Sequence, residues 1–236
     1  MRCRIADLIT EVPEADGMEI RCRGYNCKDE GGADIVIRTD LYDFSKYPPN
    51  LSRENLVYME TGRQFYARFL DFNGFYLHAS AVELDGRVYL FSGNSGVGKS
   101  THVRQWQKLF GDTARVLNDD KPALRNVDGV WYAYGTPWCG KDGININAKA
   151  PVAALCFLKQ APDNSIRRME KQEAFQNILK QTLYRYRYTE KLDKILLCIE
   201  KLLEDIPVFE LQNRPEPDAA RLSYNTMHDA AKEIQP

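Results

Sequence analysis

Hydrophobic positions along the chain fall into short stretches that predict strands. Residues 75–82 and 86–91 suit two strands joined by the turn dipeptide Asp85-Gly86, which makes them neighbours in one sheet. Residues 130–134 predict a further strand, and the run at 151–158 is nearly all apolar. Because such a run suits a strand that is buried on both faces, we expect layers of structure on both sides of the sheet.

Apolar residues at helical spacing alternate with these strands. Residues 103–110 predict a helix that Gly111 ends. The second half of the chain adds helical patterns at 175–179, 192–203 and 218–232 and a candidate edge strand at 208–211. Strands and helices in alternation predict an α/β fold.

The first part of the chain has a different pattern. Residues 1–60 consist of short alternating pieces separated by glycines and by Pro48-Pro49, which predicts a small, mostly β N-terminal lobe. We expect a short helix between Glu60 and Phe72, and residues 61–236 then form the nucleotide-binding domain. No proline- or glycine-rich linker separates the two parts, so composition does not fix their boundary.

The composition favours one soluble domain without an extreme charge. The chain has 236 residues, of which 44% are hydrophobic, and this is enough for one full-sized core. Lys plus Arg (32) nearly balance Asp plus Glu (33), so we expect neither nucleic acid nor a membrane as partner. The first residues contain no apolar h-region, and no run approaches the roughly 18 apolar residues of a membrane span. These features predict a cytoplasmic protein.

The cysteines do not form a metal-binding pattern. The six residues are scattered over the chain: Cys3, Cys22, Cys27, Cys139, Cys156 and Cys198. Cys22 and Cys27 lack a second pair that would complete a tetrahedral zinc site, and the three histidines are far apart in sequence. We therefore favour reduced, mostly buried thiols over a metal site.

One motif carries recognisable chemistry. Gly93-Asn94-Ser95-Gly96-Val97-Gly98-Lys99-Ser100, followed by Thr101, fits the phosphate-loop (Walker A) pattern. Its glycines let successive N–H groups turn toward a phosphate, and it stands between a predicted strand and a predicted helix. Lys99 is expected to reach the β- and γ-phosphates, and the Ser100 hydroxyl to bind Mg²⁺. An ordinary glycine-rich turn is the alternative.

A pair of carboxylates follows about 20 residues after this loop. The strand-like residues 114–117 lead into Asn118-Asp119-Asp120-Lys121. In an open α/β sheet the carboxyl ends of neighbouring strands face one crevice, so we expect both acids beside the γ-phosphate. One carboxylate suits Mg²⁺ binding, and the other suits proton removal from an attacking hydroxyl. Without the upstream loop, a solvated turn would be the better explanation.

Three further features leave alternatives open. Residues 135–143 form a glycine-bounded loop in which Lys141 suits a second phosphate contact or a lid, and an ordinary connection suits it as well. Residues 184–188 interleave tyrosine and arginine, a pattern that stacks on bases or grips a partner peptide but more often forms an amphipathic connection. His78, in the strand before the phosphate loop, is by spacing alone more typical of a core histidine.

Together these residues resemble the bacterial HPr serine kinase/phosphorylase family, which shares its nucleotide-binding core with ATP-dependent phosphoenolpyruvate carboxykinase. The resemblance is carried by His78-Ala79-Ser80, the phosphate loop and Asp119-Asp120, and it covers about residues 75–160. It implies a mixed α/β kinase core, ATP with Mg²⁺ and transfer to a serine-type hydroxyl. It further implies that Asp119 is the base, that Asp120 supports the metal or orients the acceptor, and that His78 faces the site.

The sequence departs from the HPr enzyme at three points. Thr101 stands where that enzyme usually has an acidic residue, and the downstream glycine-rich signature of the enzyme is missing. The loop from Gly135 to Lys141 also takes a different form. These departures favour a compact HPr-kinase-like relative, of the kind associated with modified-peptide biosynthesis, over the HPr enzyme itself. Since the related kinases commonly assemble, the resemblance also implies a homo-oligomer.

The sequence therefore predicts an ATP-dependent phosphotransferase that moves the γ-phosphoryl group to a hydroxyl of a protein or peptide. In this mechanism Lys99 and Mg²⁺ polarise the γ-phosphoryl group, and Asp119 accepts the proton. Two alternatives remain open: a nucleotide-gated peptide-binding module with slow ATPase activity, and a small-molecule kinase. The sequence does not identify the acceptor, because acceptor sites are built by loops from distant parts of the chain.

Overall fold

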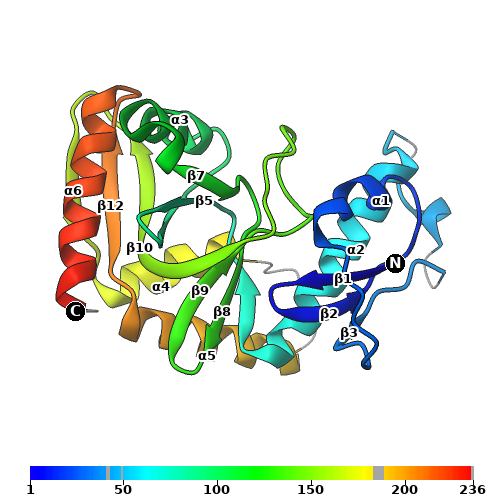
Figure 1. Cartoon of the computed structure of the whole chain (residues 1–236). Coiled ribbons are helices and arrows are strands. Elements are labelled where there is room, and N and C mark those ends of the chain that lie inside the picture. Colours follow the sequence, from blue (N-terminus) through cyan, green and yellow to red (C-terminus); the bar gives the residue numbers. More distant parts are fainter. Residues whose placement is uncertain (41–42, 49, 183–188, 235–236) are drawn as a thin grey trace.

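Two β-sheets organise the computed structural model, which describes residues 1–40, 43–48, 50–182 and 189–234 (Figure 1). Within these residues the larger sheet has nine strands, in the order β4-β8-β9-β10-β6-β5-β7, with β12 paired to β10 and β11 paired to β12. Its strands are β4 (Gly74–Tyr76), β5 (Ala79–Leu84), β6 (Arg87–Ser92), β7 (Arg115–Asn118), β8 (Ala123–Val127), β9 (Val130–Tyr134), β10 (Lys149–Gln160), β11 (Ser165–Arg168) and β12 (Val208–Asn213). Parallel and antiparallel pairs both occur, so the predicted mixed α/β fold is confirmed.

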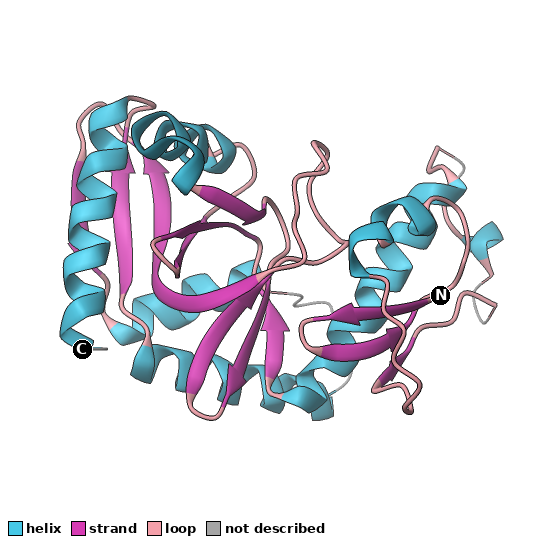
Figure 2. Ribbon diagram, in the orientation of Figure 1, coloured by secondary structure: helices cyan, strands magenta, loops and turns pink. Residues whose placement is uncertain are grey.

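The long strand β10 connects the two ends of this sheet. Its first residues pair antiparallel with β9, whereas its later residues pair in parallel with β6 and with β12. Figure 2 shows the strand curving between these partners. Its segment from Val152 to Leu158 is buried throughout, as predicted for the apolar run at 151–158.

Helices cover both faces of the larger sheet, which confirms the expected layers. The helices of the described residues are α1 (Met18–Arg21), α2 (Arg53–Phe69), α3 (Lys99–Phe110), α4 (Lys171–Gln181), α5 (Thr189–Asp205) and α6 (Pro217–Ile234). The 3-10 turns are η1 (Arg23–Tyr25), η2 (Phe44–Lys46), η3 (Leu70–Phe72) and η4 (Gly111–Thr113). α3 and α6 share one buried cluster with Tyr89 and Phe91 of β6. α4 and α5 share another cluster with Val88 and Leu90 of the same strand. Because successive strand residues point to opposite faces, the two pairs of helices lie on opposite sides of the sheet.

The N-terminal residues form the smaller sheet, made of β1 (Arg2–Ile5), β2 (Leu8–Glu11) and β3 (Ile35–Val36). β1 and β2 are antiparallel, and β2 and β3 are parallel. This sheet shares a buried cluster with Phe65 of α2 and with Trp138. The boundary expected near residue 60 falls inside α2, and the division into two domains stays a prediction.

Three predicted elements differ in the structure. The strand expected at 75–82 is two strands, because β4 pairs with β8 whereas β5 pairs with β6 and β7. The expected edge strand at 208–211 is an inner strand, since β11 covers its other side. The short helix expected after Glu60 is the longer α2, which starts after Ser52, whose Oγ accepts a hydrogen bond from the Asn55 N–H at 3.2 Å.

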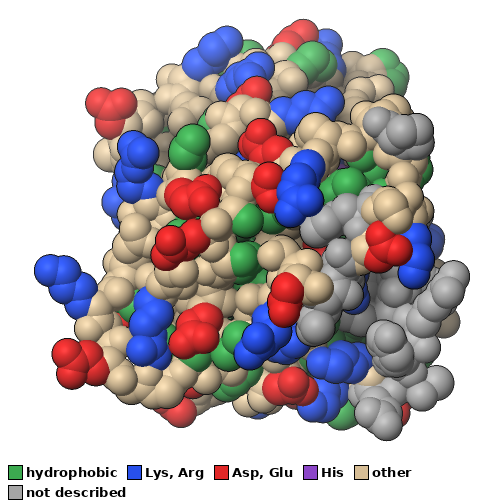
Figure 3. Space-filling model, turned by 90° about the vertical axis from the view of Figure 1, so that its right-hand side faces the viewer, with side chains coloured by type: hydrophobic (Ala, Val, Ile, Leu, Met, Phe, Trp, Pro, Cys, Tyr) green, Lys and Arg blue, Asp and Glu red, His purple; other side chains and the backbone are tan. Residues whose placement is uncertain are grey.

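The surface carries mixed charges. Figure 3 shows acidic and basic side chains interspersed over the face that includes the N-terminal lobe, in keeping with the near balance of the composition. Among the described residues, no helix combines the length and the apolar character that crossing a membrane requires.

Candidate active site

Strand order brings the predicted site residues together where β6 and β7 end and β5 begins, which we call the site edge of the larger sheet. β5 lies between β6 and β7 and is antiparallel to both, so β6 and β7 run in the same direction. The register places Ala79 opposite Ser92 and Ala81 opposite Asn118. The start of β5 therefore lies beside the ends of β6 and β7. His78 precedes β5, the phosphate loop follows β6 and Asp119-Asp120 follow β7, so all three meet at this edge.

The phosphate loop has a backbone conformation that glycine adopts readily. The φ angles of Gly93, Gly96 and Gly98 are 139°, 80° and 106°, all on the positive side that side chains disfavour. A Cβ on Gly93 would also lie 3.1 Å from the carbonyl oxygen of Leu158. The loop leads directly into α3, which begins at Lys99. It therefore has the strand-loop-helix geometry with which backbone N–H groups bind an anion.

Lys99 lies against this loop. Its Nζ donates hydrogen bonds to the carbonyl oxygens of Gly93 at 3.1 Å and of Asn94 at 3.4 Å. Burial lowers the pKa of the Lys99 ammonium, and the nearby negative charge of Asp120 opposes that shift. Lys99 and Asp120 are thus within electrostatic reach of each other.

The remaining loop residues are reachable from solvent. Asn94, Ser95 and Gly96 are exposed, Val97 and Gly98 are half-buried, and Ser100 and Thr101 are exposed in the first turn of α3. The loop is closed by a hydrogen bond from the Val97 N–H to the carbonyl oxygen of Asn94 at 3.2 Å. The exposure of these residues leaves the loop open to a ligand. That residues 93–101 contact a nucleotide stays a prediction.

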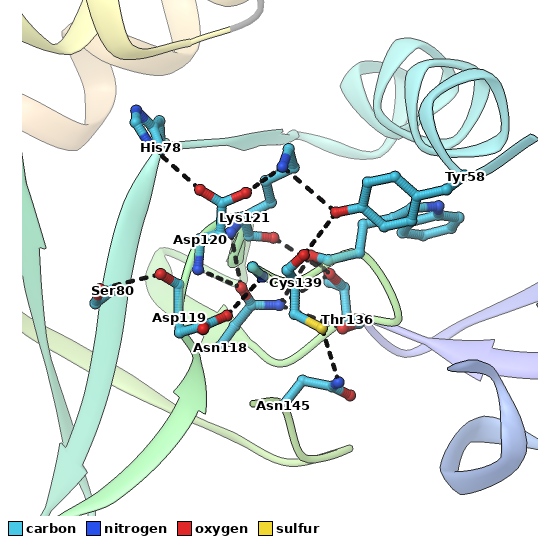
Figure 4. A network of polar contacts seen from close by, with 12 residues as sticks. Tyr58, His78, Ser80, Asn118, Asp119, Asp120, Lys121, Thr136, Cys139 and Asn145 are labelled. Carbon is cyan, nitrogen blue, oxygen red and sulfur yellow. Dashed lines mark hydrogen bonds and ion pairs between the residues drawn. The ribbon is translucent and has the colours of Figure 1, made fainter. Parts of the chain in front are cut away.

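Asn118, the last residue of β7, fixes the backbone that presents the two acids (Figure 4). The side chain is fully buried, and its Oδ1 accepts hydrogen bonds from the N–H groups of Asp120 at 3.0 Å and Lys121 at 2.7 Å. Its Nδ2 donates to the carbonyl oxygens of Thr136 at 3.2 Å and Trp138 at 3.1 Å. One amide thereby connects the acidic turn to the loop that follows β9.

Asp120 is held between two basic side chains. Its Oδ1 lies 3.2 Å from His78 Nε2, and its Oδ2 forms an ion pair with Lys121. Burial alone would raise the pKa of Asp120, but the hydrogen bond from His78 and the charge of Lys121 outweigh it and hold that pKa well below its usual range. The Lys121 ammonium also lies 3.4 Å from the hydroxyl of Tyr58 in α2. Asp120 is therefore an ionised carboxylate at neutral pH.

Asp119 has a different environment. Its Oδ1 accepts a hydrogen bond from the Gly140 N–H at 2.6 Å, and its carbonyl oxygen accepts one from Ser80 Oγ at 3.1 Å. Burial raises the pKa of the Asp119 carboxyl, and the neighbouring charge of Asp120 adds to the rise although the Gly140 N–H opposes it. A raised pKa brings a carboxylate closer to the range that suits a general base.

His78 lies between the acids and the phosphate loop. Beyond its contact with Asp120, its Nδ1 is 2.9 Å from Gln181 Oε1, and Gln181 Nε2 is 3.3 Å from Asn94 Oδ1. His78 is not inside a continuous strand, as its spacing suggested, because it stands between β4 and β5. This chain of contacts joins the end of α4 to both the loop and Asp120.

Lys141 belongs to the loop that contacts both the acidic turn and α3. Its neighbour Gly140 donates a hydrogen bond to Asp119, and its neighbour Asp142 forms an ion pair of 3.5 Å with Arg104 of α3. The Lys141 side chain is exposed and lines a cavity of about 630 Å³ between this loop and residues 17–25. No hydrogen bond or ion pair of the described residues joins Lys141 to the phosphate loop, and its phosphate contact stays a prediction.

The residues expected to hold Mg²⁺ have suitable chemistry. Ser100 offers an exposed hydroxyl at the start of α3, and Asp120 offers a carboxylate that its neighbours keep ionised. Hydroxyl and carboxylate oxygens are the ligands that Mg²⁺ takes, usually together with waters and phosphate oxygens. Among the described residues, no group of three or more His, Cys, Asp or Glu side chains forms a metal cluster, and all six cysteines are free thiols.

Several residues of the site were not singled out from the sequence. Asn118 and Lys121 flank the predicted acids, so their positions carried a signal, although their roles depend on contacts across the fold. Tyr58 and Gln181 carried no signal, because each reaches the site from a distant part of the chain. Gly140 lies in the loop at 135–143 that the sequence offered as a phosphate contact, a lid or an ordinary connection, but its contact with Asp119 depends on the fold. The Tyr-Arg segment at 184–188 lies outside the described residues.

Comparisons with known proteins give a distant structural likeness. No protein-family model matches the chain, and no curated protein matches it in sequence. One solved structure similar to the chain is the HPr(Ser) kinase/phosphatase from Coxiella burnetii, with 12% sequence identity and a TM-score of 0.39. The similarity covers 65% of this chain and 97% of that one. At this level the likeness does not transfer the activity, ligands or partners of that enzyme.

Proposed function

We propose that the protein is an ATP- and Mg²⁺-dependent phosphotransferase whose acceptor is a hydroxyl group. The observation that carries the proposal is the meeting of the phosphate loop with the two acids at one sheet edge, where the charge of Asp120 acts on Lys99. A loop that binds phosphate, a cation beside it and two carboxylates within reach are the parts that phosphoryl transfer needs.

In the proposed reaction, the acceptor oxygen forms a bond to the γ-phosphorus while the bond from that phosphorus to the β-γ bridging oxygen breaks. ADP leaves with that bonding electron pair, and the hydroxyl proton passes to the Asp119 carboxylate. The loop N–H groups and Lys99 hold the phosphates and offset their charge. Mg²⁺ bound by Ser100 and Asp120 would neutralise further negative charge on the phosphates.

The different environments of the two acids support this division of roles. The pKa of Asp120 is held low, which suits a permanently charged group that supports a metal. The pKa of Asp119 is raised, which suits a group that takes up a proton. His78 and Lys121 orient Asp120 and act on the reaction through it.

We further propose a serine-type hydroxyl on a protein or peptide as the acceptor, and a cytoplasmic homo-oligomer as the working form. A cavity of about 490 Å³ beside Lys121, lined in part by Tyr58, Tyr76 and Trp138, supports a place for the acceptor next to the acids. Incubation of the protein with γ-labelled ATP and cell extract tests the acceptor class, because the label then enters protein, peptide or metabolite. Light scattering tests the assembly.

The base assignment is tested with Asp119→Asn. We expect loss of transfer by about 10²-fold or more, the scale of general-base catalysis, while nucleotide affinity persists. Asp112→Asn in η4, an exposed aspartate, is the matched control and should keep full activity. Full transfer by Asp119→Asn would refute the base assignment. ATP binding without transfer by the unaltered protein would instead favour a nucleotide-gated binding module.

A further inference from the structure

A third cavity, of about 270 Å³, lies between the β8–β9 hairpin, η3 and α5. Figure 1 shows α5 passing along the hairpin on the side away from α3. None of the described residues that line this cavity belongs to the candidate active site. The inference drawn from it is therefore independent of the proposed phosphotransfer.

Two residues that line this cavity carry buried hydrogen-bond donors for which the described residues provide no acceptor. Asn126 is 9% exposed and Trp131 is 1% exposed, and neither Asn126 Nδ2 nor Trp131 Nε1 has a hydrogen-bond partner within the described residues. The oxygen of the Asn126 amide is occupied, because it accepts a hydrogen bond from the Gly129 N–H at 3.2 Å. Buried polar groups are nearly always paired, so two adjacent unpaired donors indicate a missing acceptor.

The strand register places the two donors side by side. Asn126 of β8 is directly opposite Trp131 of β9, so both side chains lie on one face of the hairpin. The other two tryptophans give the contrast, since Trp106 Nε1 donates to Ser223 Oγ at 3.0 Å and Trp138 Nε1 donates to Thr61 Oγ1 at 3.1 Å. An unpaired indole N–H is thus particular to the tryptophan at this cavity.

The charged groups around the cavity favour an anion. Lys194 and Lys201 of α5 both line it, and Asp71 of η3 is the acidic residue among the lining side chains. The Asp71 carboxylate is already paired with Lys194 at 2.5 Å and with Lys191 at 3.7 Å. Lys201 has no ion pair within the described residues, so a positive charge remains for a ligand.

We propose that this cavity binds a small organic carboxylate. Asn126 Nδ2 and Trp131 Nε1 are groups that donate without accepting, and carboxylate oxygens accept without donating, so the two are complementary. Lys201 would offset the negative charge. Leu70 and Leu197, which also line the cavity, provide an apolar wall for the body of such a ligand.

The probe for this proposal is benzoate, with benzyl alcohol as the neutral molecule of similar shape. The readout is the set of three indole N–H signals in a ¹⁵N NMR spectrum, with Trp131 identified by its loss in Trp131→Phe. Benzoate is added up to about 10 mM, a range that reveals millimolar affinity. We expect it to shift the Trp131 signal until the shift saturates, and to leave the signals of Trp106 and Trp138 in place. Benzyl alcohol should have little effect.

A matched pair of variants tests the charge. Lys201→Met keeps an apolar stem and should weaken benzoate binding about two- to fivefold, the scale of an exposed charge, whereas Lys108→Met on α3 should not. An unmoved Trp131 signal would mean that water alone satisfies the donors and would overturn the proposal. Equal shifts with benzyl alcohol, or equal affinities in the two variants, would overturn it as well.

Discussion

The removal of the Asn118 side chain is a direct test of how the acidic turn is built. In Asn118→Ala, the N–H groups of Asp120 and Lys121 lose their acceptor, and the carbonyl oxygen of Thr136 loses the amide that donates to it. The carbonyl oxygen of Trp138 keeps the hydroxyl of Thr136 as a donor at 3.1 Å. Three backbone groups therefore remain unpaired.

Each buried group left without a partner costs about 1–3 kcal/mol, and the lower end applies here because water reaches the half-buried turn. The expected loss for Asn118→Ala is thus about 3 kcal/mol in the free energy of unfolding. Asn213→Ala is the matched control. Within the described part of the chain this buried amide donates one hydrogen bond, to the Arg214 carbonyl oxygen at 3.3 Å, and its Oδ1 has no partner. We expect that control to cost less than about 1 kcal/mol.

Urea-induced unfolding followed by tryptophan fluorescence measures both variants, with stability extrapolated to water. Nucleotide affinity should fall little in Asn118→Ala, because the phosphate loop is held by its own backbone and by Lys99. Phosphate transfer should fall strongly, because the backbone turn that presents both carboxylates loses its support. If Asn118→Ala were no less stable than Asn213→Ala, the amide would not be what holds the turn.

Two glycine substitutions test close contacts at the same site. Gly140→Ala would place a Cβ 2.8 Å from Asp119 Oδ2. We therefore expect the rate of phosphate transfer to fall about tenfold or more, at unchanged nucleotide affinity. Gly32→Ala is the control, and it should match the unaltered protein because the space around Gly32 is open. Unchanged turnover in Gly140→Ala would contradict the role of that contact. Gly62→Ala in α2 would place a Cβ 2.9 Å from the Trp138 ring. The resulting strain of about 1–3 kcal/mol should outweigh the gain of about 1 kcal/mol in helix propensity, so we expect the free energy of unfolding and the melting temperature to fall. A rise in the melting temperature of this variant would show that the ring yields easily.

The elements that the sequence predicted well are those whose signal is local. The hairpin at Asp85-Gly86 depends on two adjacent residues, and both have positive φ angles in the structure, 52° and 74°. The helix after the phosphate loop depends on apolar spacing and on Gly111, and α3 ends at Phe110, just before that glycine. Such local patterns predict structure correctly because they do not depend on which strand or helix packs against the element.

Errors arose where a distant partner decides the outcome. Residues 75–82 alternate like one strand, but the chain changes sheet neighbours at Leu77-His78, so that β4 pairs with β8 and β5 pairs with β6. β12 resembled an edge strand, yet β11 forms on its open side. Strand pairing is a long-range property, and hydrophobic period alone does not carry it.

The sequence alone also does not distinguish the chemical roles of the two acids. In sequence Asp119 and Asp120 are identical neighbours, and the assignment of one as base came from a family resemblance. Their environments separate them. Burial raises the pKa of Asp119 and the charge of Asp120 adds to the rise, although the Gly140 N–H opposes it. Burial also acts to raise the pKa of Asp120, but His78 and Lys121 outweigh it and lower that pKa. The burial of Asp119 and the contact of Asp120 with His78 come from other parts of the fold, whereas Lys121 and the paired acid are sequence neighbours. Tertiary structure and the adjacent charges together set the two directions, and these directions support Asp119 as the proposed base.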